Sequence, residues 1–307
     1  MTCRRRITLT VIASATVLAA TSPALAQPPP PRWAPGCTVF PAGNVWNKKV
    51  RNLPVRSDSA TLIAAIGVDR GLHPDFSDQG RYGIPINVVT KRTRRVPVRF
   101  DYASESNRVR YPIPARPRIE RGSDRHMLML DRTRCRLYEL FAARRSGGRW
   151  AAGSGAVWNL RSNRLRPAGW TSADAAGLPI LPGLARPDEV ARGAIRHALR
   201  FTAPSTRSAY IYPARHFAGS ANPSLPPMGL RVRLKASVSL KGYGPQARAI
   251  LVALRDYGMI LADNGSPWYI TGVPGAWWND DDLHDLGRIT GADLEVVDTS
   301  RLRSTPR

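Results

Sequence analysis

The stretch that decides the fold runs from Gly193 to Lys235 and contains three short runs, GAIRHALRFT (193–202), SAYIYPARHFAGS (208–220) and PPMGLRVRLK (226–235). In each run apolar and polar residues alternate with a period of two, which predicts strands because successive side chains of a strand point to opposite faces. We expect these three strands to pair, and we interpret the rest of the chain around them.

Two histidines lie in this stretch. In the first run His197 shares an apolar face with Ile195, Leu199 and Phe201. The middle run ends as a strand at Pro213, and a loop follows it. If the runs pair, the imidazoles of His197 and His216 come close to two tyrosines and to an arginine of the loop. We predict a site there that includes Tyr210, Tyr212, Arg215 and His216.

A row of cations lies on one side of the third run. Arg231, Arg233 and Lys235 alternate with Leu230, Val232 and Leu234. Such a row either faces an anionic substrate or is a solvated strand face. Trp268, which follows a turn at residues 263–266, is a further candidate for contact with substrate.

The first residues predict export. Arg4, Arg5 and Arg6 precede an apolar run, and Ala24-Leu25-Ala26 forms a small-residue cleavage site, so residues 1–26 read as a secretory signal. The paired arginines leave both the general secretory and the twin-arginine routes open. No later apolar run approaches the ~20 residues that span a bilayer. The expected location is extracellular or associated with the cell envelope.

Two cysteines remain after removal of the signal. Cys37 and Cys135 in an oxidising compartment predict one disulfide, and two separately buried thiols are the alternative. The disulfide closes a loop of about 100 residues, which the chain-entropy model values at roughly 4 to 5 kcal/mol. It would tie the N-terminal arm to the middle of the chain.

The formal net charge is +24, or about +21 without the three arginines of the signal. A charge of this size attracts anionic polymers, but the arginines are spread along the chain, which is also what codon bias produces. No paired metal cysteines and no basic recognition helix accompany the charge, so no specific nucleic-acid partner is predicted. We expect a monomer.

The pattern along the chain predicts a β-rich α+β fold, with sandwich or jelly-roll-like antiparallel sheets and a few packed helices. Residues 125–130 and 135–141 read as a hairpin, and residues 150–160 read as one strand. Helices are expected over residues 59–66 and from Pro245 to Gly258. The predicted organisation is a proline-rich linker at 27–36, a single globular domain at 37–300 and a disordered tail at 301–307.

Several chemistries lack their motifs, among them the nucleophile elbow, the phosphate loop, the dinucleotide glycine motif and the zinc motif His-Glu-x-x-His. No cofactor is predicted, and a metal held by His197, His216 and a carboxylate has no supporting spacing. The candidate catalytic residues are scarce carboxylates and histidines, namely His126, Glu139, Asp174, His197, His216 and Asp263. The alternatives are that His126 and His197 are core residues and that Asp263 stabilises its own turn.

The segments WTSADAAGLPILPGL, HALRFT, PPMGLRVRLKAS and YGMILADNGS, read together, give a further indication. The series resembles a family of exported proteins found in actinobacteria and filamentous fungi, over about Phe40 to Ser300. The resemblance implies export and one continuous domain, and it assigns no activity and no role to a particular residue.

The first hypothesis for function is a secreted hydrolase that acts on an extracellular polysaccharide or a cell-envelope glycan. Glu139 with Asp174 or Asp263 would be its acid/base pair, and the histidines would orient substrate or carry the proton. The second hypothesis is a non-catalytic envelope-binding or carbohydrate-binding protein. The two differ in geometry, because an enzyme needs titratable groups that converge in one concave pocket.

Overall fold

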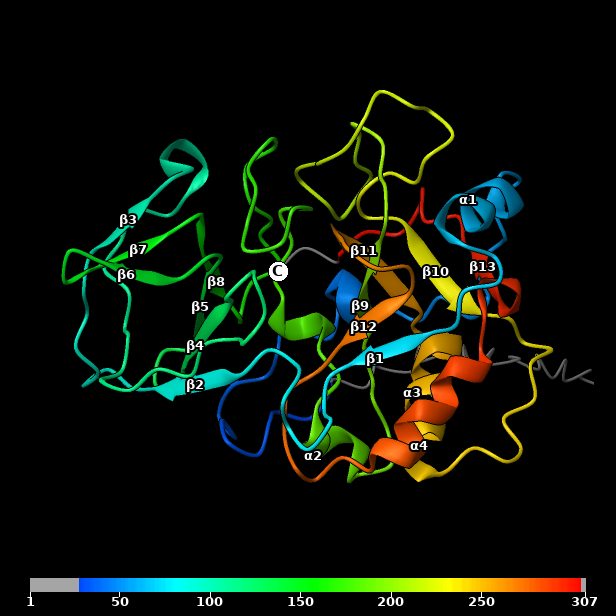
Figure 1. Cartoon of the computed structure of the whole chain (residues 1–307), viewed down its shortest axis with the longest axis horizontal. Coiled ribbons are helices and arrows are strands. Elements are labelled where there is room, and N and C mark those ends of the chain that lie inside the picture. Colours follow the sequence, from blue (N-terminus) through cyan, green and yellow to red (C-terminus); the bar gives the residue numbers. More distant parts are fainter. Residues whose placement is uncertain (1–27, 305–307) are drawn as a thin grey trace, which may run out of the picture.

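The computed structural model of the protein describes residues 28–304. Within these residues the chain forms three β-sheets, with four α-helices and several short 3₁₀ helices (Figure 1). The prediction of a β-rich α+β fold is confirmed. The predicted signal, residues 1–26, lies outside the described residues. Among those that are described, no helix has both the length and the apolar composition needed to cross a membrane.

The largest sheet has six strands and contains two of the three runs that open the sequence analysis. Its order is β1 (His73–Asp75), β12 (Tyr269–Thr271), β9 (Leu199–Ala203), β11 (Met259–Asn264), β10 (Arg231–Leu234) and β13 (Leu294–Val296). The pairs β1–β12 and β9–β11 are parallel and the other three are antiparallel. The sheet is therefore mixed, whereas the sequence pattern predicts antiparallel sheets.

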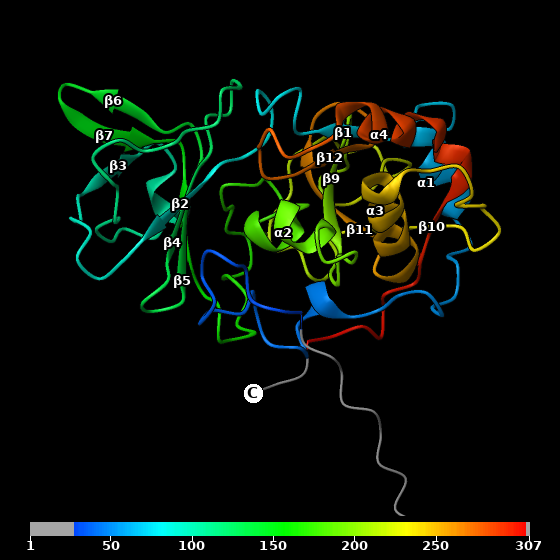
Figure 2. The ribbon, with the colours of Figure 1, turned by 90° about the horizontal axis from the view of Figure 1, so that it is seen from below.

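Two smaller sheets pack face to face at the other end of the molecule (Figures 1 and 2). One has the order β2 (Ile86–Val89), β4 (Met127–Asp131), β5 (Arg136–Leu140) and β8 (Gly155–Asn159). The other has the order β3 (Val98–Phe100), β7 (Arg149–Ala152) and β6 (Arg144–Ser146). The β4–β5 hairpin matches its prediction, whereas residues 150–160 form two strands in different sheets.

Strand β4 is buried along its whole length because both faces of its sheet are covered. Leu128 and Leu130 point into the main core, which also contains Phe201 and Leu261 of the six-stranded sheet. Met127 and Met129 point into a second core shared with the three-stranded sheet. The period-two alternation thus separates two apolar environments, and the main core runs without a break between the two ends of the molecule.

The helices gather round the six-stranded sheet, away from the two smaller sheets (Figure 2). They are α1 (Ser59–Ile66), α2 (Pro187–Val190), α3 (Pro245–Asp256) and α4 (Asp280–His284). Helix α1 has its predicted bounds, and α3 begins at Pro245, where the fixed φ of proline suits a first turn. The chain leaves α3 at Gly258, which adopts φ +66°.

A disulfide joins Cys37 to Cys135, with an S–S distance of 2.06 Å and a Cα–Cα distance of 5.3 Å. The prediction of this bond is confirmed. Both cysteines are buried in the main core, so the bond fixes the N-terminal arm against the start of β5.

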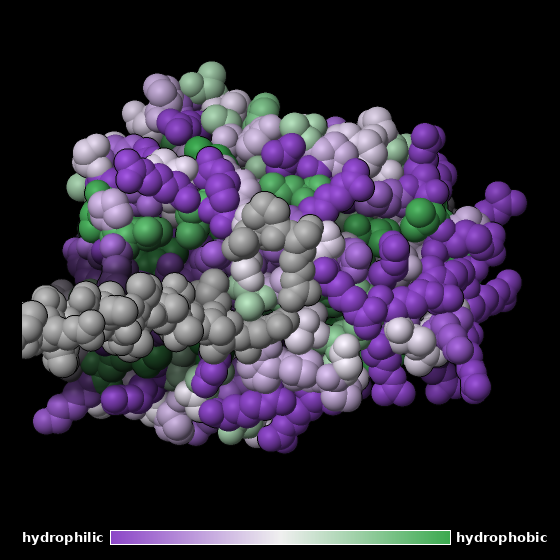
Figure 3. All heavy atoms as spheres, turned by 180° about the vertical axis from the view of Figure 1, so that it is seen from behind, coloured by the Kyte–Doolittle hydropathy of each residue, from purple (hydrophilic) through white to green (hydrophobic). Residues whose placement is uncertain are grey.

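The ends of the described chain pack more closely than composition predicts. Pro28 and Pro31 are buried, and the N–H of Arg32 donates to Asp188 at 3.2 Å. The proline-rich composition predicts a linker here that does not pack on the domain. In the predicted tail, the Ser304 hydroxyl accepts from the N–H of Val45 at 2.9 Å. Hydrophilic side chains cover most of the face seen in Figure 3, with smaller hydrophobic patches between them.

Candidate functional site

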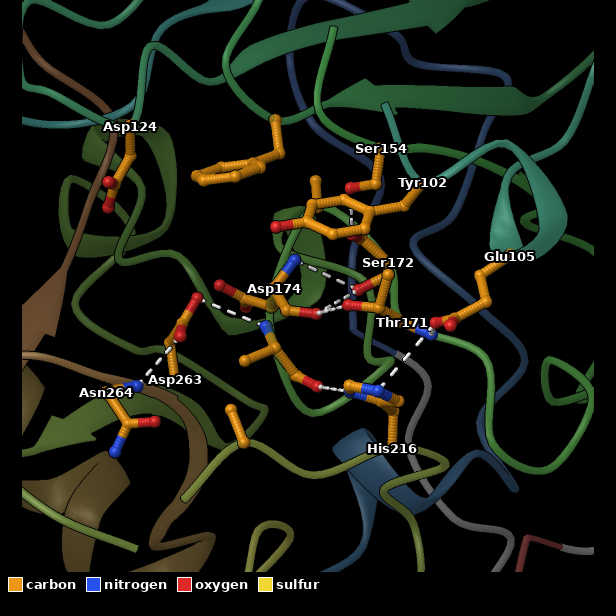
Figure 4. A pocket seen from close by; sticks show the side chains of 14 residues that line it. Tyr102, Glu105, Asp124, Ser154, Thr171, Ser172, Asp174, His216, Asp263 and Asn264 are labelled. Atoms are coloured by element: carbon orange, nitrogen blue, oxygen red, sulfur yellow. Dashed lines mark hydrogen bonds and ion pairs between the residues drawn. The ribbon is translucent and has the colours of Figure 1, made fainter. Parts of the chain in front are cut away.

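A pocket of about 350 Å³ lies where the smaller sheets meet the six-stranded sheet. Its walls carry acids, hydroxyls and one imidazole from segments far apart in the sequence: Tyr102, Glu105, Asp124, Ser154, Thr171, Ser172, Asp174, His216, Asp263 and Asn264. Figure 4 shows these side chains around a common space. Pockets at such junctions commonly bind ligands, because groups from both sides can converge there.

The floor of the pocket is the loop of residues 171–175, which we call the floor loop. Its carbonyls accept hydrogen bonds from several segments: Ser154 Oγ donates to the Ser172 carbonyl, and His126 Nε2 lies 3.0 Å from the Ala173 carbonyl. Its N–H groups donate to carboxylates, that of Thr171 to Glu105 at 2.9 Å and that of Ala175 to Asp263 at 3.2 Å. The loop is therefore fixed in place before any ligand arrives.

Beneath the floor loop lies a buried ion pair. Both carboxylate oxygens of Asp174 accept from Arg200, the contact from Nε measuring 2.9 Å, and Arg200 Nη1 donates to Thr271 at 2.5 Å. This is a two-point contact between a carboxylate and a guanidinium, the geometry in which such pairs are strongest. The negative charge of Asp174 acts on the next carboxyl group of the pocket, that of Asp263.

Asp263 is partly exposed at the end of β11. Burial raises its pKa to about 7, and the charge of Asp174 adds to that rise, while Arg200 and the Ala175 N–H oppose it. A β-bulge sets the direction of the side chain, since the pairing of β11 with β9 shifts between Leu261 and Asp263. Near neutral pH this carboxyl exists in both protonation states, as a general acid or base requires.

Glu105 and His216 lie on the opposite side of the pocket from Asp263 and Asp124 (Figure 4). His216 Nδ1 is 2.7 Å from the Ala175 carbonyl, which can only accept, so Nδ1 carries a proton. The other ring nitrogen, Nε2, faces Glu105 Oε2 at 3.7 Å. The side chains of His216 and Glu105 are 27% and 32% exposed, so a ligand in the pocket can reach both.

His126 is a buried cation beside the pocket and does not line it. Its Nδ1 contacts Glu120 at 2.6 Å, and its Nε2 faces the Ala173 carbonyl. Burial alone would lower the pKa of His126, but the hydrogen bond and the charge of Glu120 raise it to about 9. Both ring nitrogens hold protons and both are engaged, so the ring supports the floor loop from behind.

No protein-family model, curated protein or solved structure matches the chain. The function is therefore inferred from the chemistry of this pocket, because a fold alone does not determine an activity. Among residues 28–304, no group of three or more His, Cys, Asp or Glu side chains is arranged to hold a metal ion.

Of the predicted catalytic residues, Asp174, His216 and Asp263 meet in the pocket, and three do not line it. Glu139 is fully buried elsewhere and accepts from the N–H groups of Ile180 at 2.9 Å and Leu181 at 3.0 Å. His197 contacts the Ala198 carbonyl at 2.8 Å and Glu189 at 3.0 Å. The structure thus places Glu139 and His197 in the core, with all their hydrogen-bonding atoms paired to protein groups.

The predicted row of cations is engaged with the protein. Arg231 is buried and donates to the carbonyls of Tyr257 at 2.7 Å and Lys48 at 3.1 Å. Arg233 pairs with Glu295 at 2.7 Å, and Lys235 donates to a backbone carbonyl. These cations hold the segments around the strand together, whereas the sequence leaves contact with an anionic substrate and a solvated face as the two alternatives.

The remaining predicted substrate contacts also lie away from the pocket lining described for residues 28–304. The predicted strand at Tyr210 and Tyr212 is a loop with one isolated bridge. The Tyr212 hydroxyl contacts Ser304, Arg215 donates to the Arg166 carbonyl at 2.9 Å, and Trp268 is fully buried with its indole N–H on the Gly67 carbonyl.

Sequence reasoning missed Tyr102, Glu105, Asp124 and Arg200. Glu105 had one usable signal, since the chain contains only five glutamates. Arg200 had none, because the alternation of its strand only puts it opposite the apolar face, whereas the structure buries it on Asp174.

Proposed function

We propose that this chain is an exported enzyme that hydrolyses an extracellular polysaccharide or a cell-envelope glycan by acid–base catalysis. The proposal depends mainly on one observation, the placement of a carboxyl group that can donate a proton opposite a carboxylate that can accept one, in the same pocket. A carboxyl group with a pKa of about 7, that of Asp263, lies across the pocket from the carboxylate of Glu105, which accepts from the Thr171 N–H and has His216 beside it.

In this mechanism Asp263 is the general acid. It donates its proton to the oxygen that leaves the anomeric carbon, and the bond between that carbon and oxygen breaks. Asp174 favours this role, because its negative charge helps to keep the proton on Asp263 in the free enzyme. The Asp174–Arg200 pair is thus a positioning and charge-setting group beneath the reacting atoms.

Glu105 is the general base. It takes a proton from a water molecule whose oxygen bonds to the anomeric carbon, so that one water is consumed for each glycosidic bond broken. Its carboxylate is oriented by the Thr171 N–H, and His216 Nε2 lies beside it. His216 is held by the Ala175 carbonyl and therefore keeps the same nitrogen toward Glu105.

The substrate class is supported by the other walls and by the setting. Tyr102 and Phe141 offer aromatic faces on which a sugar ring can stack, and the acids and hydroxyls accept and donate to sugar hydroxyls. The Cys37–Cys135 disulfide and the predicted signal favour an extracellular site of action. The convergence of Asp263, Glu105 and His216 in one concave pocket favours an enzyme over a purely binding protein.

The test uses purified mature protein and measures reducing ends released from a panel of soluble polysaccharides and from isolated cell envelopes. Asp263→Asn and Glu105→Gln should each lower the rate by about a hundredfold or more. The control is Asp69→Asn, which removes an exposed acid outside the pocket and should leave the rate unchanged. Binding without release by any of these proteins would place the chain in the carbohydrate-binding class instead.

A further inference from the structure

A second hollow, a groove of about 510 Å³, lies between the edge of the four-stranded sheet and residues 162–170. Arginine, tryptophan and asparagine side chains line it, among them Asn107, Arg136, Trp158, Arg164, Arg166 and Trp170. No carboxylate lines it within the described residues. The groove is thus basic and aromatic, unlike the acidic pocket.

Arg166 is a buried cation in the wall of this groove. It donates to Asn107 at 2.7 Å and to the Glu105 carbonyl at 2.6 Å, and its Nε has no partner. Its guanidinium lies 5.6 Å and 5.4 Å from the ring centres of Trp158 and Trp170. Within residues 28–304 no carboxylate lies close enough to form an ion pair with Arg166. Burial lowers the pKa of Arg166 to about 10, and the charges of Glu139 and Glu105 oppose that fall only in part.

Two more arginines extend this positive charge to the surface. Arg136 and Arg164 are exposed, and in the described part of the chain neither guanidinium has a hydrogen-bond or ion-pair partner. Guanidinium groups bind carboxylate and phosphate oxygens in a planar, two-point manner, and an indole face such as that of Trp170 packs on a sugar ring. An acidic sugar matches this combination of groups.

The groove and the pocket have no lining residue in common, but one hydrogen bond and one peptide bond connect their walls. Glu105 gives its carbonyl to Arg166 in the groove and its carboxylate to the pocket, and Trp170 of the groove precedes Thr171 of the pocket. We infer that the groove binds the acidic group of a polyanionic polysaccharide whose neighbouring unit occupies the pocket. The second half of this inference rests on the proposed function, whereas binding in the groove does not.

The experiment measures binding without turnover, as the change in tryptophan fluorescence or in electrophoretic mobility on titration with polygalacturonate. Dextran sulfate and neutral dextran test whether the acidic group must be a carboxylate. The double variant Arg136→Gln/Arg164→Gln should bind polygalacturonate about tenfold more weakly or worse, since it loses two charge-assisted contacts. The matched control Arg99→Gln/Arg196→Gln removes two exposed arginines outside the groove, neither of which forms an ion pair with any residue from 28 to 304, and its affinity should stay within about twofold of the wild type.

Equal losses in the two double variants would overturn the inference, because binding would then follow net charge alone. So would a single-stranded DNA oligonucleotide that binds the wild type more tightly than polygalacturonate and loses its affinity in the groove variant. Failure of the proposed function has a different signature: no polysaccharide is hydrolysed, yet the groove variant still binds polygalacturonate more weakly than the control.

Discussion

Replacing His126 by Gln should change how stability depends on pH. The ring is buried between Glu120 and the floor loop, and its pKa in the folded protein is about 9, against about 6.5 in an unfolded chain. The folded state therefore holds this proton more tightly. The stabilisation from this proton is fully present below about pH 6.5 and is lost as the pH rises through about 9.

The size of this stabilisation follows from the difference between the folded and unfolded pKa values of His126. At about 1.4 kcal/mol for each pH unit, the wild type should lose about 3 kcal/mol from this group between pH 6.5 and pH 10, and His126→Gln should lose none of it. The advantage of the wild type over the variant should therefore shrink by that amount across the range.

Urea denaturation at a series of pH values gives this difference directly. His284→Gln is the control, because His284 is exposed. A constant difference between the wild type and His126→Gln from pH 6 to pH 10 would refute the assignment of His126 as a cation supporting the floor loop.

Three further outcomes are expected. Reduction of the Cys37–Cys135 bond, or Cys37→Ser with Cys135→Ser, should lower stability by roughly 4 to 5 kcal/mol in chemical denaturation; a loss below about 1 kcal/mol would contradict the fixing of the N-terminal arm. Glu139→Gln should lower the free energy of unfolding by about 1 to 3 kcal/mol, because the N–H₂ group of the glutamine would face the backbone N–H donors of residues 180 and 181. The hydrolytic rate of this variant should stay near that of the wild type. His197→Gln should likewise lower the melting temperature and preserve the rate; a folded variant that loses the rate would return His197 to the active site.

Local elements of this fold follow well from the sequence. The Ser59–Ile66 helix, the β4–β5 hairpin and the helix that starts at Pro245 depend on short-range signals, namely periodicity, capping and proline at a first turn. The disulfide follows from cysteine number and export. These features need no knowledge of how distant segments meet.

The site depended on contacts that periodicity does not encode. The alternation of the opening stretch separates apolar from basic side chains, and it leaves the basic side of the third run open to solvent or to an anionic substrate. Both faces of the sheet are covered instead, so Arg200 pairs with Asp174 and Arg231 donates to carbonyls of distant segments. Glu105 ends a three-residue 3₁₀ helix (Ala103–Glu105), and only the folded chain brings it to His216.

The pH dependence of hydrolysis tests the central claim most directly. Reducing-end release from the best polysaccharide substrate, measured as kcat/KM from pH 4 to pH 10, should fall above a pH of about 7, because deprotonation of Asp263 removes the general acid. Asp263→Asn should lack that fall and stay at a uniformly low rate. A wild-type rate that keeps rising to pH 9, or a fall above neutral pH that Asp263→Asn retains, would contradict the assignment of Asp263 as the catalytic acid.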